Sequence, residues 1–324
     1  MMLSEEELRK IVTPLINSPR AGILLGEGGS GTVYKIGNYV VKMMRLVVDS
    51  DIEVFREEVE VWEKLHAEKS LRPYIPYYLG SILIDRPRNL PAYLRDSVGC
   101  IVQTYEPVMN MADYVDQYKE RSTFLEFSRG QELFRNLIRA FAELHEAGYI
   151  HRDIKTLNIL IRTEGDTTMP IIIDFGLVCK IPCVKEHACL GENNAPMGSE
   201  YYLVPDLVPT HKREVYHGIL PIHTRPTFLE YIQDRIMCRR KRRQRYIRVQ
   251  TSKNTVRGVY TIATDNYALS LVLDDLFEVI SWEGHVEQKM EAKEQILRLK
   301  YEIIPYLASS IGKKRENVAK EAYL

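Results

Sequence analysis

Between residues 23 and 44 the sequence reads as three short strands joined by tight connections. The apolar run 23–25 leads into a glycine-rich stretch at 26–31, a second strand-like run follows at 33–36, and the pair Gly37-Asn38 precedes a third run at 39–44. Connections this short, with turn residues inside them, favour hairpins. The start of the chain therefore predicts a small antiparallel β-sheet.

Helical periodicity flanks this predicted sheet. Ser4 is a candidate N-cap with a capping-box glutamate at Glu7, and the apolar residues up to position 17 recur at helical spacing. The same period returns at 51–66, and strand-like runs follow at 81–84 and 100–102. We expect residues 1–21 to form a helical extension that covers the sheet.

Helical patterns dominate after Tyr105-Glu106-Pro107, so we place a lobe boundary there. This predicts a first lobe at 22–104 and a second at 105–324. The second lobe should contain a long amphipathic helix at about 130–147, ended by Gly148, and a final helical part from Asp265 onward. Short strands are expected at 159–161 and 171–173. The predicted fold class is α+β.

Composition limits the classes of function open to this chain. It has 324 residues, 45% of them hydrophobic, which is enough for a full core in two lobes. The 44 basic and 44 acidic residues give a formal net charge of zero, which excludes a generic polyanion binder. Five cysteines do not resemble a secreted disulfide framework, and no apolar run approaches the roughly 20 residues of a membrane span. We expect an intracellular protein, in the cytoplasm or nucleus, with no membrane partner.

Two polar motifs carry the chemistry. The run 151–158 offers the carboxylate of Asp153, the cation of Lys155 and the amide of Asn158, and Asp174 ends the apolar run 171–173. Magnesium prefers hard oxygen ligands of the kind that Asn158 and Asp174 provide. Together these residues could position a hydroxyl and two magnesium ions around a phosphate.

The glycine-rich stretch is a candidate phosphate loop. Its glycines lack a Cβ and would let backbone amides approach phosphate oxygens. An ordinary glycine hairpin is the alternative, whereas a dinucleotide-binding loop is disfavoured because a strand, not a helix, follows. The residues that fit the spacing G-x-G-x-x-G-x-V are Gly26, Glu27, Gly28, Gly31 and Val33.

Lys42 ends a strand two elements after this loop, so its side chain could reach beneath the glycines. Glu58 lies on the inward face of the following predicted helix and could orient the ammonium, with Glu57 as the fallback.

In order and spacing, these motifs resemble those of the eukaryotic protein kinase family. The stretch 198–206 resembles the family's G-T-x-x-Y-x-A-P-E segment, and Asp265 begins a run that is similar to the start of its central buried helix. The resemblance covers about residues 22–206 and 265–324. It implies a two-lobed protein-kinase-like fold, with a small antiparallel sheet in the first lobe and a mainly helical second lobe.

The resemblance also implies roles for single residues. Asp153 would steer the proton of the substrate hydroxyl, Lys155 would balance the charge of the transferred group, and Lys42 would bind the α- and β-phosphates of ATP. Asn158 and Asp174 would hold magnesium. At the adenine, Gln103 takes the gatekeeper position and Val40 the place under the ring, and the hinge residues are Thr104, Tyr105 and Glu106.

The implied function is an ATP-dependent serine/threonine protein kinase, because Lys155 and Ser199 resemble the pattern of that class. One alternative is a nucleotide-binding pseudokinase that acts as a scaffold through its basic insertion. A small-molecule kinase is disfavoured because 198–206 resembles a platform for peptide substrates.

The loop before that platform departs from the family. It has no serine, threonine or tyrosine between Leu177 and Gly198, so Arg152 lacks the usual phosphorylated partner, although Glu186 or Glu192 could supply an anion. The loop carries instead a cluster of potential zinc ligands. Structural zinc, free thiols that only pack, and redox regulation all remain open for these residues. The cluster comprises Cys179, Cys183, His187 and Cys189.

An insertion at about 207–262 separates this segment from the final helical part. Seven of the ten residues from Arg239 to Arg248 are basic. This stretch fits a solvated helix face, a nuclear-localisation signal or a dock for an acidic partner, and nucleic acid is the weakest candidate because Tyr246 is its only aromatic residue. We also expect Arg315 to pair with Asp206.

Overall fold

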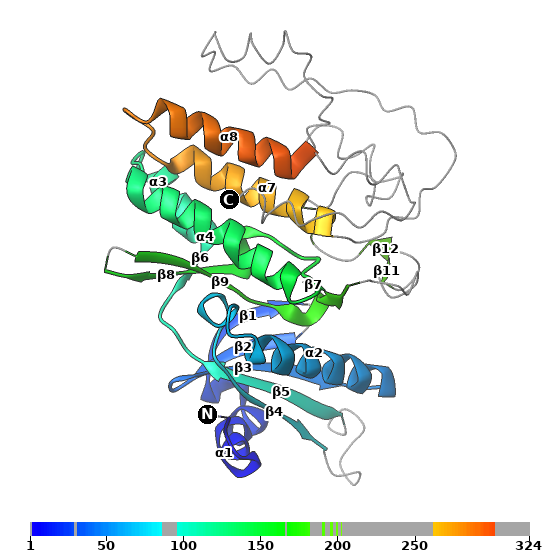
Figure 1. Cartoon of the computed structure of the whole chain (residues 1–324). Coiled ribbons are helices and arrows are strands. Elements are labelled where there is room, and N and C mark those ends of the chain that lie inside the picture. Colours follow the sequence, from blue (N-terminus) through cyan, green and yellow to red (C-terminus); the bar gives the residue numbers. More distant parts are fainter. Residues whose placement is uncertain are drawn as a thin grey trace. The chain divides into compact units, whose positions relative to one another are not determined.

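The structure is a computed structural model that describes residues 2–28, 31–85, 96–165, 167–181, 190–191, 195–196, 199, 202 and 262–301. The chain packs as two compact units, whose elements Figure 1 labels. Unit 1 comprises Met1–Tyr114 and Leu157–Val178, and unit 2 comprises Val115–Thr156 and Cys179–Leu324. The lobes proposed from the sequence, 22–104 and 105–324, stay a prediction.

A five-stranded antiparallel sheet forms the centre of unit 1, with the order β1-β2-β3-β5-β4. Gly37, at a positive φ of 57°, makes the tight turn between β2 and β3. The antiparallel sheet expected from the short connections is confirmed. Its strands are β1 (Ile23–Gly28), β2 (Gly31–Ile36), β3 (Tyr39–Leu46), β4 (Tyr78–Ile84) and β5 (Ser97–Thr104).

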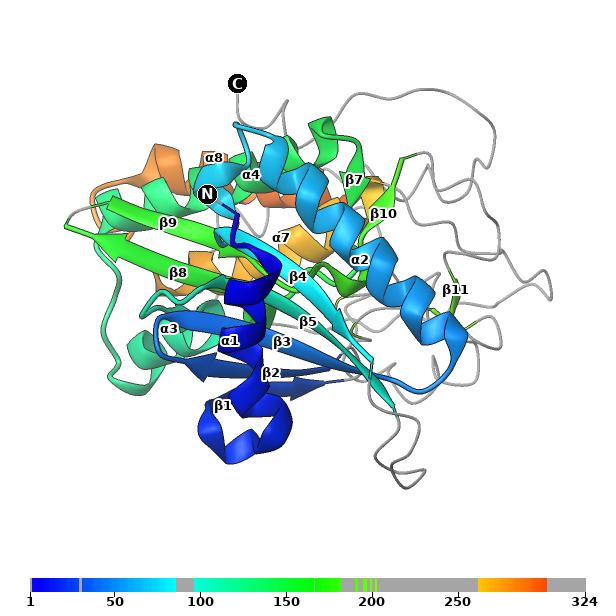
Figure 2. The same cartoon turned by 90° about the horizontal axis from the view of Figure 1, so that it is seen from below.

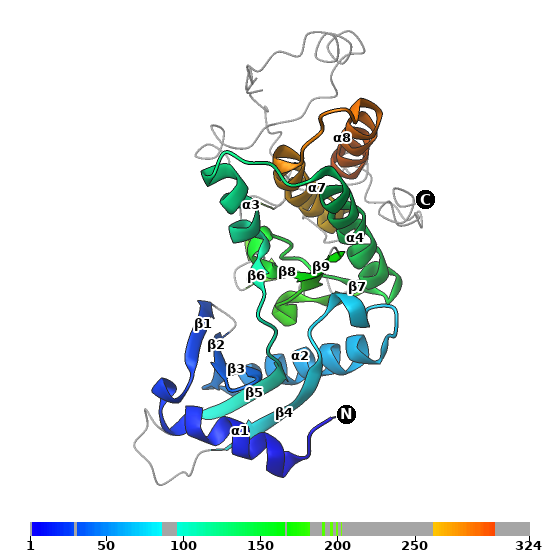
Figure 3. The ribbon, with the colours of Figure 1, turned by 90° about the vertical axis from the view of Figure 1, so that its left-hand side faces the viewer.

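Two helices cover opposite faces of this sheet (Figure 3). Helix α1 (Glu5–Asn17) begins at the expected Ser4 capping box, and its buried residues pack with one set of strand positions that includes Val41 and Cys100. Alternate strand positions face the other way. A Cβ on Gly99 would lie 2.5 Å from the Phe55 ring of α2 (Asp49–Ala67). Lys42, next to Val41, therefore points to the α2 side.

The second part of unit 1 is a three-stranded sheet with the order β6-β8-β9. It consists of β6 (Met109–Asn110), β8 (Ile159–Glu164) and β9 (Thr167–Ile172), of which β8 and β9 run side by side as a hairpin (Figure 2). Short 3₁₀ turns precede and follow this hairpin at η4 (Thr156–Asn158) and η5 (Phe175–Leu177). Two further 3₁₀ turns are η1 (Pro19–Ala21) and η2 (Arg72–Tyr74). Helix α3 (Met111–Glu120) leads out of the unit.

Unit 2 is mainly helical. Its long helices are α4 (Phe127–Glu146), α7 (Ile262–Val279) and α8 (Val286–Tyr301), and α7 packs against both of the others. The α7 helix is buried almost all round, which is why its polar residues need partners inside the unit. Short strand pairs join β7 (Tyr149–Ile150) to β10 (Cys179–Lys180) and β11 (Leu190–Gly191) to β12 (Ala195–Pro196).

The predicted α+β fold class is confirmed, as are the helices at 4–17, 51–66 and 130–147 to within a few residues. The final helical part begins as expected and is described to residue 301. The insertion with its basic segment Arg239–Arg248, and the pair Arg315 and Asp206, lie outside the described residues. Among the helices that the structure describes, none is long and apolar enough to cross a membrane.

Candidate active site

Lys42 is the centre of a buried ion cluster in unit 1. Its Nζ donates hydrogen bonds to Glu58 Oε1 at 2.8 Å and Oε2 at 3.0 Å, and to Asp174 Oδ1 at 3.1 Å. Lys42 and Glu58 are buried, whereas Glu57 is exposed. The alternation of β3 turns Lys42 toward α2, and the helical period turns Glu58 inward. The structure therefore brings together the preferred pair from the sequence and not the fallback.

The charge of Lys42 is stabilised at this position. Burial alone would lower the pKa of Lys42, but the neighbouring carboxylates of Glu58 and Asp174 outweigh it and raise that pKa above its ordinary value. The ammonium is therefore charged at neutral pH.

Asp174 takes its place through the residues around it. Its backbone is left-handed, with φ 63° and ψ 74°, a conformation that a non-glycine residue adopts only when its surroundings hold it. Phe175 provides an anchor, because its ring is 1% exposed and packs edge-on against Trp62 of α2 at 4.7 Å. The Asp174 side chain remains 37% exposed and can reach a ligand.

Asn158 lies just before β8, at the same open end of the β8–β9 hairpin as Asp174, because Ile159 pairs with Ile172. The backbone N–H of Ile173 donates to the Asn158 carbonyl at 3.0 Å, so the residue before Asp174 is paired directly with Asn158. Asn158 is 7% exposed. The hairpin thus brings the backbones of Asn158 and of the segment that carries Asp174 together, while their predicted role in holding magnesium stays a prediction.

The glycine-rich stretch lies at the connection of β1 and β2, where Gly28 pairs with Gly31. Gly31 has a φ of 133°, and a Cβ there would lie 2.6 Å from the Met43 carbonyl oxygen. A Cβ on Gly26 or Gly28 would meet no described atom within 4 Å. Gly31 is therefore required by the fold, whereas Gly26 and Gly28 leave open space over the strands. Glu27 lies between them and is exposed.

The predicted adenine-binding residues gather on β3, β5 and the segment after β5. Val40 is paired with Gln103 across β3 and β5, and Val33 is paired with Lys42 across β2 and β3.

The segment after β5 is held by its own contacts. The backbone N–H groups of Thr104 and Tyr105 donate to the carbonyls of Tyr77 at 3.0 Å and Asn38 at 2.9 Å. The Glu106 carboxylate accepts from Arg162 Nη1 at 3.2 Å.

In unit 2, Asp153, Lys155 and Ser199 form a closed set of hydrogen bonds. Lys155 Nζ donates to Asp153 Oδ2 at 2.7 Å and to Ser199 Oγ at 2.8 Å, and the Ser199 N–H donates to Asp153 Oδ1 at 2.7 Å. Ser199 thus bridges the carboxylate and the ammonium.

A buried aspartate supports the backbone that carries this set. Asp265 of α7 is 1% exposed, and its carboxylate accepts from the N–H groups of His151 at 2.6 Å and Arg152 at 2.9 Å. His145 Nε2 lies 3.0 Å from the same carboxylate. Burial would raise the pKa of Asp265, but these hydrogen bonds and the two histidines outweigh it and lower that pKa. Arg152, at a φ of 68°, is held in a left-handed conformation.

Sequence reasoning missed this supporting role of Asp265 and His145. A signal was present, because an aspartate in a helix that is otherwise buried must find partners. The sequence does not say which partners, since His145 lies 120 positions earlier in the chain.

The predicted zinc site is not supported. Cys179 is disulfide-bonded, so its sulfur is not the free thiolate that zinc requires. Cys183, His187 and Cys189 lie outside the described residues. In the part of the chain that the structure describes, no group of three histidine, cysteine or acidic side chains could hold a metal.

Comparison with known proteins adds to this geometry. The family described as Protein kinase domain matches residues 21–219, more than half of the chain. The chain belongs to the protein kinase domain family. The match runs through Lys42, Asp153, Asp174 and Ser199, so the two hydrogen-bonded clusters are parts of a kinase domain.

Curated relatives of this kinase domain are serine/threonine kinases at low identity. It is 23% identical over 188 residues to the serine/threonine-protein kinase cst-1 of Caenorhabditis briggsae, covering 57% of this chain and 33% of the relative. It is 28% identical over 198 residues to the serine/threonine-protein kinase MPS1 of Saccharomyces cerevisiae, covering 56% and 22%. It is 29% identical over 182 residues to the citron Rho-interacting kinase of Mus musculus, and the match covers 56% of this chain and 7% of the relative. The chain thus spans a third or less of the length of these relatives.

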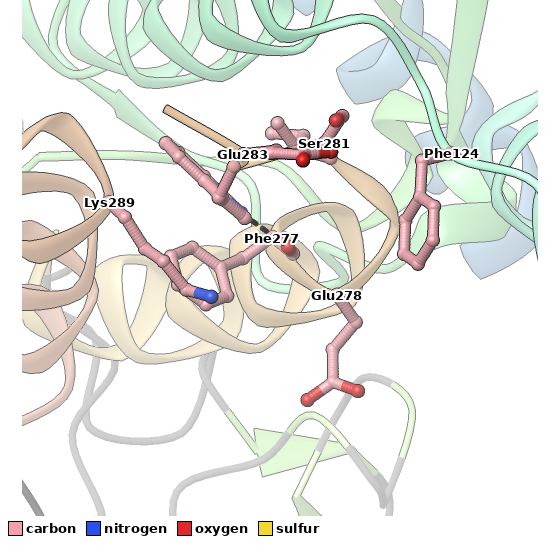
Figure 4. A pocket seen from close by; sticks show the side chains of 8 residues that line it. Phe124, Phe277, Glu278, Ser281, Glu283 and Lys289 are labelled. Carbon is pink, nitrogen blue, oxygen red and sulfur yellow. Dashed lines mark hydrogen bonds between the residues drawn. The ribbon is translucent and has the colours of Figure 1, made fainter. Parts of the chain in front are cut away.

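A pocket lies elsewhere in unit 2, around the end of α7 (Figure 4). Phe277 is one of its walls, and its carbonyl accepts from Trp282 Nε1 at 3.0 Å. Phe277 lies twelve positions after Asp265, a distance of about 18 Å along α7. The pocket contains none of the predicted site residues. The other lining residues are Phe124, Glu278, Ile280, Ser281, Trp282, Glu283 and Lys289.

Proposed function

We propose that this kinase domain transfers the γ-phosphoryl group of ATP to serine or threonine hydroxyls of proteins, with magnesium. The observation that carries the proposal is the set of contacts of Lys42, which bonds to Glu58 and to Asp174 at the same time. In protein kinases, phosphoryl transfer needs the lysine–glutamate pair and the metal-binding aspartate to be in place together.

The residues proposed to bind ATP belong to unit 1, and their tasks can be stated one by one. Lys42, oriented by Glu58, binds the α- and β-phosphates as a charged ammonium. The open space over Gly26 and Gly28 admits phosphate oxygens to the backbone. Val40 and Gln103 border the adenine, and the backbone of Thr104 and Glu106 supplies its hydrogen-bonding groups.

The residues present fit magnesium. Asn158 and Asp174 provide an amide oxygen and a carboxylate on adjoining ends of one hairpin, and Asp174 is exposed enough to reach a ligand. Bound magnesium would neutralise the charge on the phosphate oxygens. The tasks of the protein are to hold Asp174 in its left-handed conformation through Phe175 and to keep Asn158 beside it.

On the hydroxyl side, Asp153 accepts or steers the proton of the substrate hydroxyl, and Lys155 balances the charge that develops on the transferred group. Ser199 holds the two in register. Asp265 fixes the backbone before Asp153, so that the carboxylate does not need to reorganise when the proton moves.

The experiment is transfer of labelled phosphate from ATP to a generic protein substrate in the presence of magnesium, with Asp174→Ala as the control. We expect serine and threonine labelling by the wild type at more than about 100 times the rate of the control, since removal of one charge-stabilising group commonly costs 10²–10³-fold. Labelling no faster than by the control would refute the enzyme and leave a scaffold. Labelling of a small molecule alone would refute the protein substrate.

A further inference from the structure

A contact of Thr156 is not needed by the chemistry described above. Thr156 follows Lys155 directly, is 8% exposed, and its Oγ1 lies 3.2 Å from the hydroxyl of Tyr202. Both residues belong to unit 2. The bond is partly buried, and a bond between two neutral hydroxyls contributes modestly to stability, so its main consequence is to fix the position of Tyr202 relative to Thr156.

The contact completes a set that fixes both ends of a short turn. At one end, Ser199 is bonded to Asp153 and Lys155. At the other end, Tyr202 is bonded to Thr156, and the Tyr202 N–H closes the turn by donating to the Ser199 carbonyl at 2.9 Å. Ser199 and Tyr202, together defined here as the substrate turn, are thus each attached by a side chain to the run 153–156.

Such an attachment matters because the preceding loop cannot be ordered by phosphorylation of its own residues. No serine, threonine or tyrosine lies between Leu177 and Gly198. A phosphate in such a loop acts by adding charge that pairs with an arginine. The Thr156–Tyr202 bond holds the substrate turn by neutral hydroxyls and requires no modification.

We propose that Thr156 is a positioning residue whose hydroxyl, acting through Tyr202, holds the substrate turn ready for protein substrate without phosphorylation. This inference rests on the proposed kinase activity and adds the way in which its substrate segment is kept in place. The effect should be specific to protein substrate, because Thr156 and Tyr202 lie in unit 2 with Asp153, whereas the contacts proposed for ATP lie in unit 1.

The test compares variants that separate the effect of the Thr156 hydroxyl from the effect of the shape of its side chain. Thr156→Val removes the hydroxyl and keeps the branched side chain, while Thr156→Ser keeps the hydroxyl and removes the methyl group. Tyr202→Phe removes the other partner of the same bond. The wild type is also assayed after treatment with a broad-specificity phosphatase and removal of that phosphatase.

We expect Thr156→Val and Tyr202→Phe each to raise KM for protein substrate about threefold to tenfold, the loss of one hydrogen bond. KM for ATP should stay within about twofold, and Thr156→Ser should match the wild type to the same extent. The double variant should be no worse than either single variant, because one bond is lost only once. Phosphatase treatment should leave the activity unchanged.

The inference would be overturned if Thr156→Val matched the wild type, if Thr156→Ser failed as severely as Thr156→Val, or if phosphatase abolished the activity. Amide hydrogen exchange supplies a readout that does not depend on turnover. The Ser199 and Tyr202 amides should exchange faster in Thr156→Val than in Thr156→Ser. A wild type without transfer above Asp174→Ala would refute the proposed function, whereas equal exchange in the two variants would refute the role of Thr156.

Discussion

Replacing Lys42 with methionine should destabilise the kinase domain far more than the loss of one surface charge would. Methionine fills similar space but removes the ammonium, so the buried carboxylate of Glu58 loses its cation. Removing one partner of a buried pair typically costs about 3–5 kcal/mol, because the remaining charge is left uncompensated.

The magnitude follows from opposing terms. At 2.8 Å, unit charges on Lys42 and Glu58 attract by about 6 kcal/mol at an effective dielectric constant near 20. Burying two ions costs several kcal/mol each, so the pair as a whole is worth little compared with an uncharged one. The double variant Lys42→Met/Glu58→Gln removes both charges and should recover most of the loss. The ion pair of Lys42 with Asp174 contributes less to the free energy of unfolding, because the Asp174 side chain is 37% exposed and hydrated.

The assay is urea unfolding at pH 7 of the wild type, both single variants and the double variant, together with phosphoryl transfer. Stability should fall in Lys42→Met and return in the double variant, while transfer should stay lost in both because the ammonium proposed to bind phosphate is absent. The reasoning fails if Lys42→Met unfolds within about 1 kcal/mol of the wild type, the range of an exposed pair. It also fails if the double variant is no more stable than Lys42→Met.

Three further predictions test the supports of the site. Asp265→Asn should cost about 3 kcal/mol in urea unfolding at pH 7, because an amide cannot accept from both backbone N–H groups with equal strength. Since the pKa of Asp265 is lowered in the folded protein, its ionised carboxylate stabilises the fold above about pH 4, and this stabilisation is lost as the pH falls through the folded pKa. The difference in free energy of unfolding between the wild type and Asp265→Asn should therefore become smaller in acid and stay unchanged in base. Gly31→Ala should lower the melting temperature, because its Cβ would lie 2.6 Å from the Met43 carbonyl oxygen. Gly28→Ala should melt like the wild type and should instead raise KM for ATP. A lower melting temperature for Gly28→Ala than for Gly31→Ala would contradict the structural role given to Gly31. Trp62→Ala should cost about 3–5 kcal/mol and also reduce transfer, because it removes the ring against which Phe175 anchors Asp174; full activity per folded molecule would show that this anchor is dispensable.

Local patterns were enough to predict most elements of the fold. The glycine-rich hairpin, the capped helix α1 and the long helix α4 depend on interactions between residues near in sequence, which periodicity and turn chemistry report directly. The pair of Lys42 and Glu58 was also predicted, because the strand and helix periods each assign one inward face.

Contacts between residues far apart in sequence were harder to predict. The Asp265 carboxylate joins His145, His151 and Arg152 from more than 110 positions away. No local period marks such a contact, and several acidic residues could have met the same need. The zinc site is not supported for a related reason, because cysteine spacing alone does not reveal that Cys179 is disulfide-bonded.

The sequence by itself determined the kinase motifs and their order, since residue type and spacing along the chain are sufficient to recognise them. Tertiary structure decided which of these groups touch. It placed Lys42 between Glu58 and Asp174, set Asp174 in a left-handed conformation next to Phe175, whose ring packs against Trp62, and joined Thr156 to Tyr202. Hydrogen bonds depend on distances of a few tenths of an ångström, and those distances arise only when elements far apart in the chain are packed together.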